Sequence, residues 1–353
     1  MKKSTLRFPL TLLFVAATFI SALCISSCKL GYTQIQVLKP ADIMLPAHFQ
    51  KFVIANRTRP GKGNGQGAMN VLEGVLTGEG IFTDRWGAED CVEGLRQELA
   101  LTPRYSITVA ALDTALKGTG RRQTMPALDW VTVGKLIGGD TSTALVVLEA
   151  FDSNTNIASE LASAATATAA ASYRANGRVD VYCVWRIYDY KNKTVVDEFS
   201  QDFNTSFSGT GVTAAIAESN LPTRNNMVER AGIAAGTAYG QRISPQYIWV
   251  SRNYYKKGSV GIRQAAHLAR LRNWHDATDK WNTLATNADN KVARRASYNL
   301  ALAAEQNGQL DLAIQWAQRA QTLGEKRATR YLVILNQRKA DQDRLAQQMK
   351  GKQ

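Results

Sequence analysis

The densest group of chemically versatile side chains in this sequence is Asp84-Arg85-Trp86. A carboxylate and a guanidinium beside an indole ring can recognise a polar ligand such as a glycan. Glu73 and Glu79 could add carboxylates for hydrolysis if the fold sets them at the right separation. An ordinary salt bridge that caps the fold accounts for the same residues, and we favour this simpler interpretation.

The usual catalytic and cofactor motifs are missing from the sequence. It has neither the Gly-x-Ser-x-Gly turn of serine hydrolases nor the His-Glu-x-x-His pattern of metalloproteases. The glycine-rich stretch 61–67 (GKGNGQG) lacks the ending of a phosphate-binding loop and the spacing of a dinucleotide-binding turn. His48, His267 and His275 are scattered, whereas zinc ligands usually come in closely spaced pairs. We therefore expect no enzyme, no metal and no cofactor.

Cys28 has the clearest predicted chemistry. Lys2, Lys3 and Arg7 open the chain, an apolar run covers residues 8–23, and Ile-Ser-Ser precedes the cysteine. This order is typical of an export signal, and the cysteine resembles that of a bacterial lipobox, which becomes the new N-terminus and carries lipid such as palmitate. The apolar run is shorter than the ~20 residues of a membrane-spanning helix. An ordinary signal peptide and an uncleaved membrane helix are the less favoured alternatives.

The residues around the cysteine also bear on its destination. Cys24 is a poorer lipidation candidate because Leu23, which is not small, precedes it. Lys29, Leu30 and Gly31 follow the favoured cysteine. They provide neither the aspartate that retains lipoproteins at the inner membrane nor an acidic cluster that directs surface display. We expect a lipid anchor in the outer membrane, with the protein facing the periplasm.

The charge of the chain restricts its partners. The sequence has 43 Lys and Arg against 29 Asp and Glu, a formal charge of +14, and the mature part keeps +11 without the three cations of the signal. A basic excess favours anionic surfaces, which outside the cytoplasm are lipid head groups, lipopolysaccharide or acidic glycans. Export argues against nucleic acid as a partner. A solvated basic helix face is the simpler account of the C-terminal charge.

Two further cysteines, Cys91 and Cys183, lie in apolar stretches. An oxidising compartment permits a disulfide between them. Single buried thiols are nevertheless common in protein cores. The sequence leaves both alternatives open and favours two separate thiols.

Residues 41–250 alternate between strand and helix patterns, which predicts an α/β or α+β domain. Cys91, Leu95 and Leu99 recur at helical spacing, and residues 88–90 (AED) place acidic side chains in the first turn. This pattern predicts a helix that Pro103 ends. Alternating residues 179–190 predict a strand that turns at 191–193 into a hairpin. Residues 158–175 are low in complexity and are expected to form a poorly packed helix or a surface insertion. Further strands are expected at 49–56, 106–112 and 143–151, and further helices near 126–140 and 224–242.

The C-terminal region is predicted to be helical and to repeat. Ala265 matches Ala301 and Ala277 matches Ala313, each at an offset of 36 residues. Small residues at these places allow paired helices to approach closely, as in the tetratricopeptide repeat with its period of ~34 residues. Stacked repeats of this kind present a concave surface that can hold a protein partner. A plain bundle of α-hairpins that binds nothing is the alternative.

These patterns divide the chain into four parts. We assign residues 1–27 to a lipoprotein signal peptide, 28–40 to a tether, 41–250 to the α/β envelope domain and 251–353 to the tetratricopeptide-like domain. The fold class is thus an α+β or α/β domain followed by an all-α repeat domain.

Three stretches of sequence resemble an uncharacterised family of bacterial lipoproteins that has tetratricopeptide-like C-termini. They are residues 39–58, with KPADIMLP and FVIANRT; residues 72–88, LEGVLTGEGIFTDRWGA; and residues 243–258, ISPQYIWVSRNYYKKG. The resemblance implies an envelope α/β domain joined to helical repeats, and it supplies no substrate and no functional residues.

The preferred function is a non-enzymatic, lipid-anchored scaffold that binds a protein partner through its helical repeats. A glycan-binding or hydrolytic protein with its site near Asp84-Trp86 is the alternative. The α/β pattern is also loosely similar to envelope assembly lipoproteins such as the curli secretion protein, which leaves a homo-oligomeric assembly component as a third hypothesis.

Overall fold

The computed structural model describes residues 30–58, 83–109, 116, 122–164, 166 and 170–350. The predicted lipidation site Cys28, the glycine-rich stretch, Glu73 and Glu79 lie outside these residues. No helix among the described residues is long and apolar enough to cross a membrane. The chain forms two compact units, which we call the sheet unit (Leu38–Tyr247 with the residues from Arg344 onward) and the helical unit (Ile248–Asp343 with the residues up to Val37).

The sheet unit is built on a five-stranded mixed sheet with the strand order β3-β2-β4-β5-β6. Strand β2 pairs in parallel with β3 and β4, whereas β4, β5 and β6 are antiparallel neighbours. Short turns can join only antiparallel strands, so the parallel part lies where longer connections intervene. The strands are β2 Lys51–Asn56, β3 Ser106–Val109, β4 Thr143–Ser163, β5 Ser172–Asp189 and β6 Thr194–Gly211.

Alternation along β5 places one of its faces in the core. Val179, Val181, Cys183, Trp185 and Ile187 are all buried in the same hydrophobic cluster, as the period of two predicts. Helices α3, Thr83–Ala100, and α6, Arg224–Ile243, pack on this face. The sheet-rich prediction for this part of the chain is therefore confirmed.

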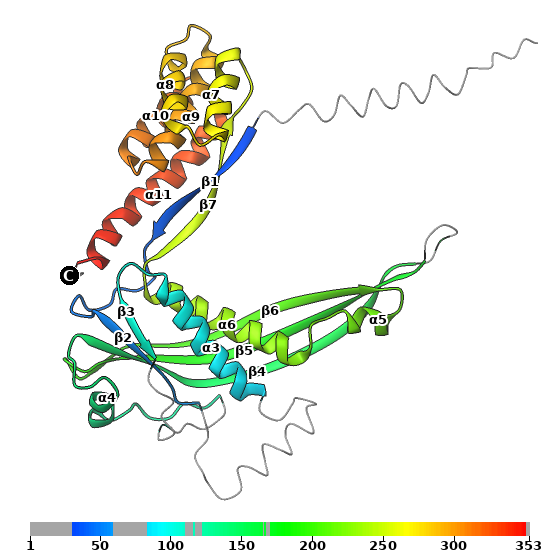
Figure 1. Ribbon diagram of the computed structural model, residues 1–353, viewed down its shortest axis with the longest axis vertical. Helices are drawn as coiled ribbons and strands as arrows, with labels where there is room; N and C mark the ends of the chain where they lie inside the picture. The colour runs from blue at the N-terminus through cyan, green and yellow to red at the C-terminus, as the bar shows by residue number, and fades with distance from the viewer. Residues whose placement is uncertain are drawn as a thin grey trace, which may run out of the picture. The chain divides into compact units, whose positions relative to one another are not determined.

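The structure of residues 158–175 differs from the expected poorly packed helix or surface insertion. Where described, they are neither a helix nor an insertion, because Ala158 continues β4 and pairs with Asn176 of β5, and Glu160 pairs with Arg174. The predicted loop after residue 207 also continues β6 to Gly211. Figure 1 shows these three strands running on beyond α6, toward the short helix α5, Ala214–Ser219. Ala, Ser and Thr carry no periodic hydrophobic signal, so the backbone pairing decides the conformation here.

Helices α3 and α6 approach unusually closely because glycines face the contact. A Cβ atom on Gly236 would lie 1.8 Å from the carbonyl oxygen of Cys91, and one on Gly94 would lie 2.1 Å from that of Ile233. No side chain fits at such distances. The predicted close-packing side of residues 224–242 is thus the side that meets α3.

Helix α4, Trp130–Leu136, covers the opposite face of the sheet. Its residue Val133 packs with Val53, Leu145 and Tyr188 in a second cluster. Gly138 and Gly139 end the helix region in the left-handed conformation, with φ of 65° and 73°, as the Gly-Gly pair predicts. The sheet is thus enclosed by helices on both faces (Figure 1).

The helical unit contains several consecutive helices, which confirms an all-helical C-terminal region. Gly308, with φ of 74°, forms the predicted turn between α9 and α10. Residues that the sequence assigned to a tether form strand β1, Leu30–Lys39, which pairs with β7, Gln246–Tyr255. The helices are α7 Val260–Arg270, α8 Trp274–Ala285, α9 Asn290–Gln306, α10 Leu310–Thr322 and α11 Lys326–Gln348.

Candidate functional site

The predicted group Asp84-Arg85-Trp86 lies on the first turn of α3 and does not converge on one point. One oxygen of Asp84 accepts hydrogen bonds from the backbone N–H of Ser153 at 2.9 Å and from its hydroxyl at 2.6 Å. Arg85 lies 3.5 Å from Glu89 one turn along the helix, and Trp86 is half exposed. Consecutive residues of a helix point in different directions. The observed role of Asp84 is to fix the start of α3 to strand β4.

Cys91 and Cys183 are both free thiols, fully buried between α3 and β5. Burial raises the pKa of Cys91 well above its usual 9.0, and a hydrogen bond with Cys183 adds to this effect. A thiol is reactive only as the thiolate, so Cys91 is not suited to nucleophilic chemistry.

The four alanines singled out for repeat packing, Ala265, Ala277, Ala301 and Ala313, are completely buried in one hydrophobic core. They lie on α7, α8, α9 and α10 respectively. Their small side chains let these helices pack together. The sequence did not predict that this core also includes Tyr254 and Tyr255 of strand β7.

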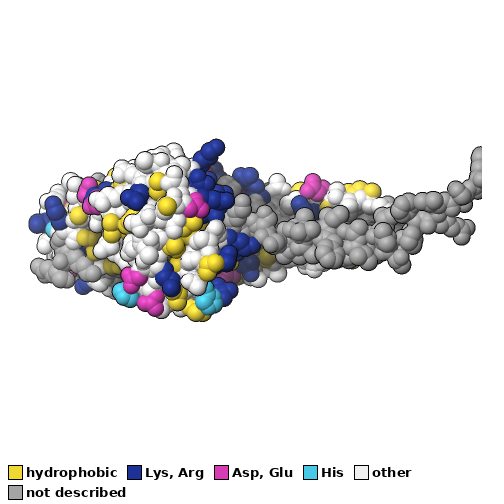
Figure 2. Space-filling view, turned by 90° about the horizontal axis from the view of Figure 1, so that it is seen from above, with side chains coloured by type: hydrophobic (Ala, Val, Ile, Leu, Met, Phe, Trp, Pro, Cys, Tyr) yellow, Lys and Arg dark blue, Asp and Glu magenta, His cyan; other side chains and the backbone are white. Residues whose placement is uncertain are grey.

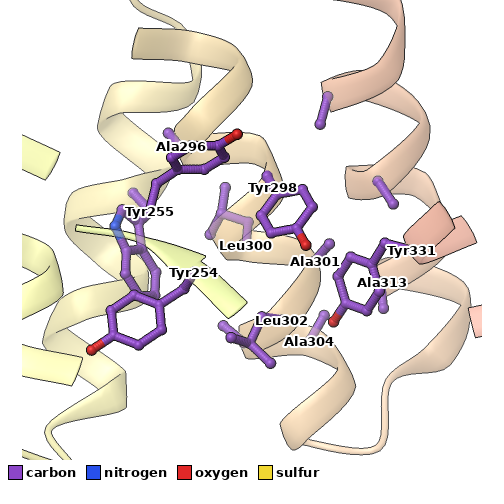
Figure 3. Close-up of a cluster of buried hydrophobic side chains, with 14 of the residues drawn as sticks. Tyr254, Tyr255, Ala296, Tyr298, Leu300, Ala301, Leu302, Ala304, Ala313 and Tyr331 are labelled. Atoms are coloured by element: carbon purple, nitrogen blue, oxygen red, sulfur yellow. The ribbon is translucent and has the colours of Figure 1, made fainter. Parts of the chain in front are cut away.

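A side chain of α9 forms hydrogen bonds with the backbone of strand β7. The side-chain oxygen of Asn299 accepts a hydrogen bond from the N–H of Tyr255 at 2.7 Å, and its amide nitrogen donates to the carbonyl of the same residue at 2.8 Å. Asn299 is completely buried. Figure 3 shows the two tyrosines of the strand on one side of Leu300 of α9, with Tyr331 farther away on the other side. A carboxamide that satisfies both backbone groups of one residue recognises an extended chain irrespective of its sequence.

A buried carboxylate fixes the same strand to two helices. Glu305 of α9, 2 % exposed, accepts two hydrogen bonds from Arg252 of β7, at 2.8 and 2.9 Å. Tyr331 donates to it at 2.6 Å and Arg338 at 2.7 Å, both from α11. Burial alone would raise the pKa of Glu305, but these donors outweigh it and lower the pKa below the usual 4.5. The group is thus a charged, fully bonded centre for β7, α9 and α11.

Arginines complete the contacts with the end of the strand. Arg295 donates to the carbonyl of Lys257 at 3.0 Å, and its guanidinium lies 5.0 Å from the centre of the Tyr255 ring. Arg327 donates to the Tyr255 hydroxyl at 3.0 Å. The helical unit therefore holds residues 252–257 of its own chain through backbone, carboxylate and ring contacts.

The residues around Asn299 and Glu305 bind a strand of their own chain and do not form a catalytic arrangement. The Glu305 carboxylate is buried and fully hydrogen-bonded, so it is not poised to exchange protons with a substrate. Sequence reasoning missed it because β7 reads as a connection between domains. A usable signal was present, since the polar residues Asn299 and Glu305 directly flank the apolar run 300–304 (LALAA).

One group of metal-ligand residue types is close together among the described residues. His275, Asp276 and Asp279 of α8 bring their ligand atoms within 4.8 Å of one another, and all three are exposed. Exposed acidic side chains on one helix turn are ordinary surface, so we assign no metal to them.

The surface of the helical unit combines exposed apolar residues with an excess of basic ones. Leu271 is 61 % exposed and Val333 is 69 % exposed. Residues 260–348 contain 14 Lys and Arg against eight Asp and Glu. Figure 2 shows Lys and Arg side chains distributed over the visible face with hydrophobic side chains between them.

Comparison with known proteins gives two family matches. Residues 49–255, more than half of the chain, match the family described as a domain of unknown function, DUF8603. Residues 263–346 match a second domain of unknown function, DUF6340. No match was found among curated proteins.

Three bacterial proteins are among the solved structures with some similarity. A candidate lipoprotein from Caulobacter crescentus is 16 % identical, with 44 % of this chain and 77 % of that chain covered, at a TM-score of 0.17. A candidate homologue of the neuraminyllactose-binding hemagglutinin from Helicobacter pylori is 10 % identical, with 58 % and 88 % covered, at 0.25. A hypothetical protein from Chlamydia trachomatis is 10 % identical, with 54 % and 96 % covered, at 0.21. TM-scores this low establish no common fold, and we take nothing from them about function.

Proposed function

We propose that this chain, which belongs to the DUF8603 family of unknown function, is a non-enzymatic envelope protein, lipid-anchored through Cys28, that binds a protein partner through its helical unit. The observation that supports this proposal is the exposed surface of that unit, where Leu271, Leu312 and Val333 are 61 %, 40 % and 69 % exposed among an excess of Lys and Arg. Asn299 and Glu305, by contrast, are buried and bonded to the chain's own strand β7.

The contacts of strand β7 bear on where a partner would bind. Asn299 and Glu305 hold this strand with short hydrogen bonds to Tyr255 and Arg252. Displacing the strand would leave buried polar groups unpaired, at a cost of about 1–3 kcal/mol for each. We therefore assign the partner to the exposed surface residues Leu271, Leu312 and Val333.

The chemistry of this exposed surface of the helical unit indicates the kind of partner. Scattered apolar side chains surrounded by arginine and lysine favour a protein surface with complementary acidic groups. The predicted signal sequence supports a partner in the cell envelope, and we favour the periplasmic face of the outer membrane.

Site-specific photo-crosslinking in living cells tests the proposal. The photoreactive residue p-benzoylphenylalanine replaces Leu271, Leu312 or Val333 in the full chain. We expect adducts with one envelope protein, identified by mass spectrometry, from at least one of these positions. Val212 and Leu161 of the sheet unit are matched controls because they are 59 % and 54 % exposed. The absence of adducts, or the same adducts at the control positions, would refute partner binding by the helical unit.

A further inference from the structure

The sheet unit contains a hollow that none of the predicted sites includes. It lies between α4 and the turn that joins β5 to β6, and its cavity volume is about 440 Å³. This size suits a small ligand or part of a larger one. We call it the α4 pocket, and its lining residues are Trp130, Val131, Gly134, Lys135, Gly138, Tyr190 and Lys193.

The aromatic side chains that line the α4 pocket are held in place by packing against neighbouring residues. The Trp130 ring meets the buried Tyr188 ring edge-on at 6.1 Å. The Tyr188 hydroxyl in turn donates to Glu149 at 2.6 Å and accepts from the N–H of Leu128 at 3.1 Å. A Cβ atom on Gly134 would lie 2.8 Å from the Tyr190 ring, so the missing side chain lets that ring stand against α4. The pocket is thus preformed.

Two lysines make the pocket positive. The ammonium of Lys193 lies 2.9 Å from the centre of the Tyr190 ring and 5.8 Å from that of Trp130. Lys193 has a φ of 53°, a left-handed conformation that is uncommon for a residue other than glycine. The turn therefore places a lysine where glycine would fit more easily.

Neighbouring carboxylates do not neutralise these cations. Within the described residues, neither Lys135 nor Lys193 forms an ion pair. Asp129 is bonded to the N–H groups of Val131 and Thr132, which it caps, and Asp189 is bonded to His48 and Asn192. The positive charge consequently remains available to a ligand.

The lining also limits the chemistry of that ligand. It contains two ammonium groups and an apolar wall, and it has no carboxylate or carboxamide side chain. A neutral sugar would find few acceptors for its hydroxyl groups, and unpaired buried donors are costly. An amphiphile with one anionic head and an apolar body matches every wall of the pocket.

We propose that the α4 pocket binds an anionic phospholipid at a bilayer surface. The phosphate accepts hydrogen bonds from Lys135 and Lys193, and the glycerol and upper acyl region lie against Trp130, Tyr190 and Val131. Val131 is 67 % exposed and is free to enter the interface. Trp and Tyr prefer this depth of a membrane, and basic residues there gain attraction from anionic lipids. This inference concerns the sheet unit and is independent of the partner proposed for the helical unit.

Vesicle co-sedimentation tests the α4 pocket. The mature chain from Cys28 onward, made without its signal so that it carries no lipid, is mixed with phosphatidylcholine vesicles with or without phosphatidylglycerol. We expect binding only with phosphatidylglycerol, and binding about fivefold weaker for Lys193→Gly and for Trp130→Ala. Lys193→Gly suits the left-handed turn, so this variant should fold, and circular dichroism checks it.

A neighbouring lysine provides the matched control. Lys191 lies in the same turn and does not line the pocket, so Lys191→Gly should bind nearly as well as the unchanged chain. Equal weakening by Lys191→Gly and Lys193→Gly would show general charge attraction and overturn the proposal. Equal binding to vesicles without phosphatidylglycerol would also overturn it. Competition by glycerol 1-phosphate at the vesicle-binding affinity would reassign the pocket to a soluble phosphorylated compound.

Discussion

At the scale of single residues, the most informative side chain is Asn299. Its carboxamide bonds both the N–H and the C=O of Tyr255, and its side chain is completely buried. A leucine at this position would have a similarly branched side chain but would offer neither bond. The residue therefore joins a helix to a strand that lies 44 positions earlier in the chain.

Replacing Asn299 tests this role. Asn299→Ala leaves a buried N–H and a buried carbonyl without partners, so we expect the free energy of unfolding to fall by about 2–5 kcal/mol. Chemical denaturation followed by circular dichroism measures the change. Asn282→Ala, on the exposed side of α8, is the control and should change stability by less than about 0.5 kcal/mol. A similar small effect at both positions would contradict the assigned role.

Glu305 makes a prediction about pH. Its pKa in the folded protein lies below the 4.5 of an unperturbed glutamate, because donors from Arg252, Tyr331 and Arg338 outweigh burial. A carboxyl group with a lowered pKa stabilises the fold above its unfolded pKa, and that contribution is lost as the pH falls through the folded value. The advantage of the unchanged chain over Glu305→Gln should thus be largest above about pH 4.5 and shrink below it.

The measurement is the free energy of unfolding of both chains between neutral and acidic pH. Glu218→Gln, at an exposed position of the sheet unit, is the control for general acid effects. If the difference in free energy of unfolding between the unchanged chain and Glu305→Gln stays constant or grows on acidification, the ionised carboxylate of Glu305 is not the form that accepts these hydrogen bonds.

At the scale of elements, close packing of α3 and α6 depends on glycine. Alanine favours helix over glycine by up to about 1 kcal/mol, so a glycine in a helix needs a reason in the packing. At Gly236 the reason is the backbone of Cys91, 1.8 Å from where a Cβ would stand. Backbone atoms cannot rotate away as a side chain can, so the helices themselves must separate.

Gly236→Ala should therefore destabilise the sheet unit by about 1–3 kcal/mol despite its better helix propensity. Thermal unfolding gives the change. Gly261→Ala in α7 is the matched control, because its added Cβ would meet only the movable side chain of Leu284. We expect that variant to be neutral or more stable. A stabilised Gly236→Ala chain would mean that the two helices are not held at this distance.

The elements also show how far sequence reasoning reaches. Strand β5 was predictable because Val179 to Ile187 alternate between the core and the opposite face. Residues 158–175 were not, since alanine, serine and threonine fit either conformation and only pairing with a neighbouring strand selects one. Strands β1 and β7 read as linkers for a similar reason. They pair across more than 200 positions of sequence, and no local pattern reveals such a partner.

The candidate site follows the same rule. Asn299 and Glu305 could be recognised as polar residues at the two ends of an apolar run of α9, but their partners Tyr255 and Arg252 could not. Polar groups in a core signal that a bond exists, and the fold determines which group makes it. For Asp84 the sequence suggested a salt bridge that caps the fold, whereas the structure shows hydrogen bonds from the backbone and hydroxyl of Ser153.

At the scale of the whole molecule, the two proposals assign different kinds of binding to the two units. The helical unit has a surface with exposed apolar and basic residues, whereas the sheet unit has the positive α4 pocket with aromatic walls. Both proposed sites would act at a membrane surface if the chain is tethered there. Such a tether would set the concentration of each site near its ligand.

The tether itself gives the last prediction. If Cys28 is cleaved and acylated, the protein fractionates with membranes, because several acyl chains give stable anchoring where a single chain binds only marginally. Cys28→Ala should leave the precursor uncleaved or release a soluble form, as immunoblots of membrane and soluble fractions would reveal. Metabolic labelling with an alkyne fatty acid should mark the unchanged chain but not Cys28→Ala. Cys24→Ala is the control and should be processed normally; labelling that depends on Cys24 would move the anchor to that residue, and unchanged processing of Cys28→Ala would refute the anchor.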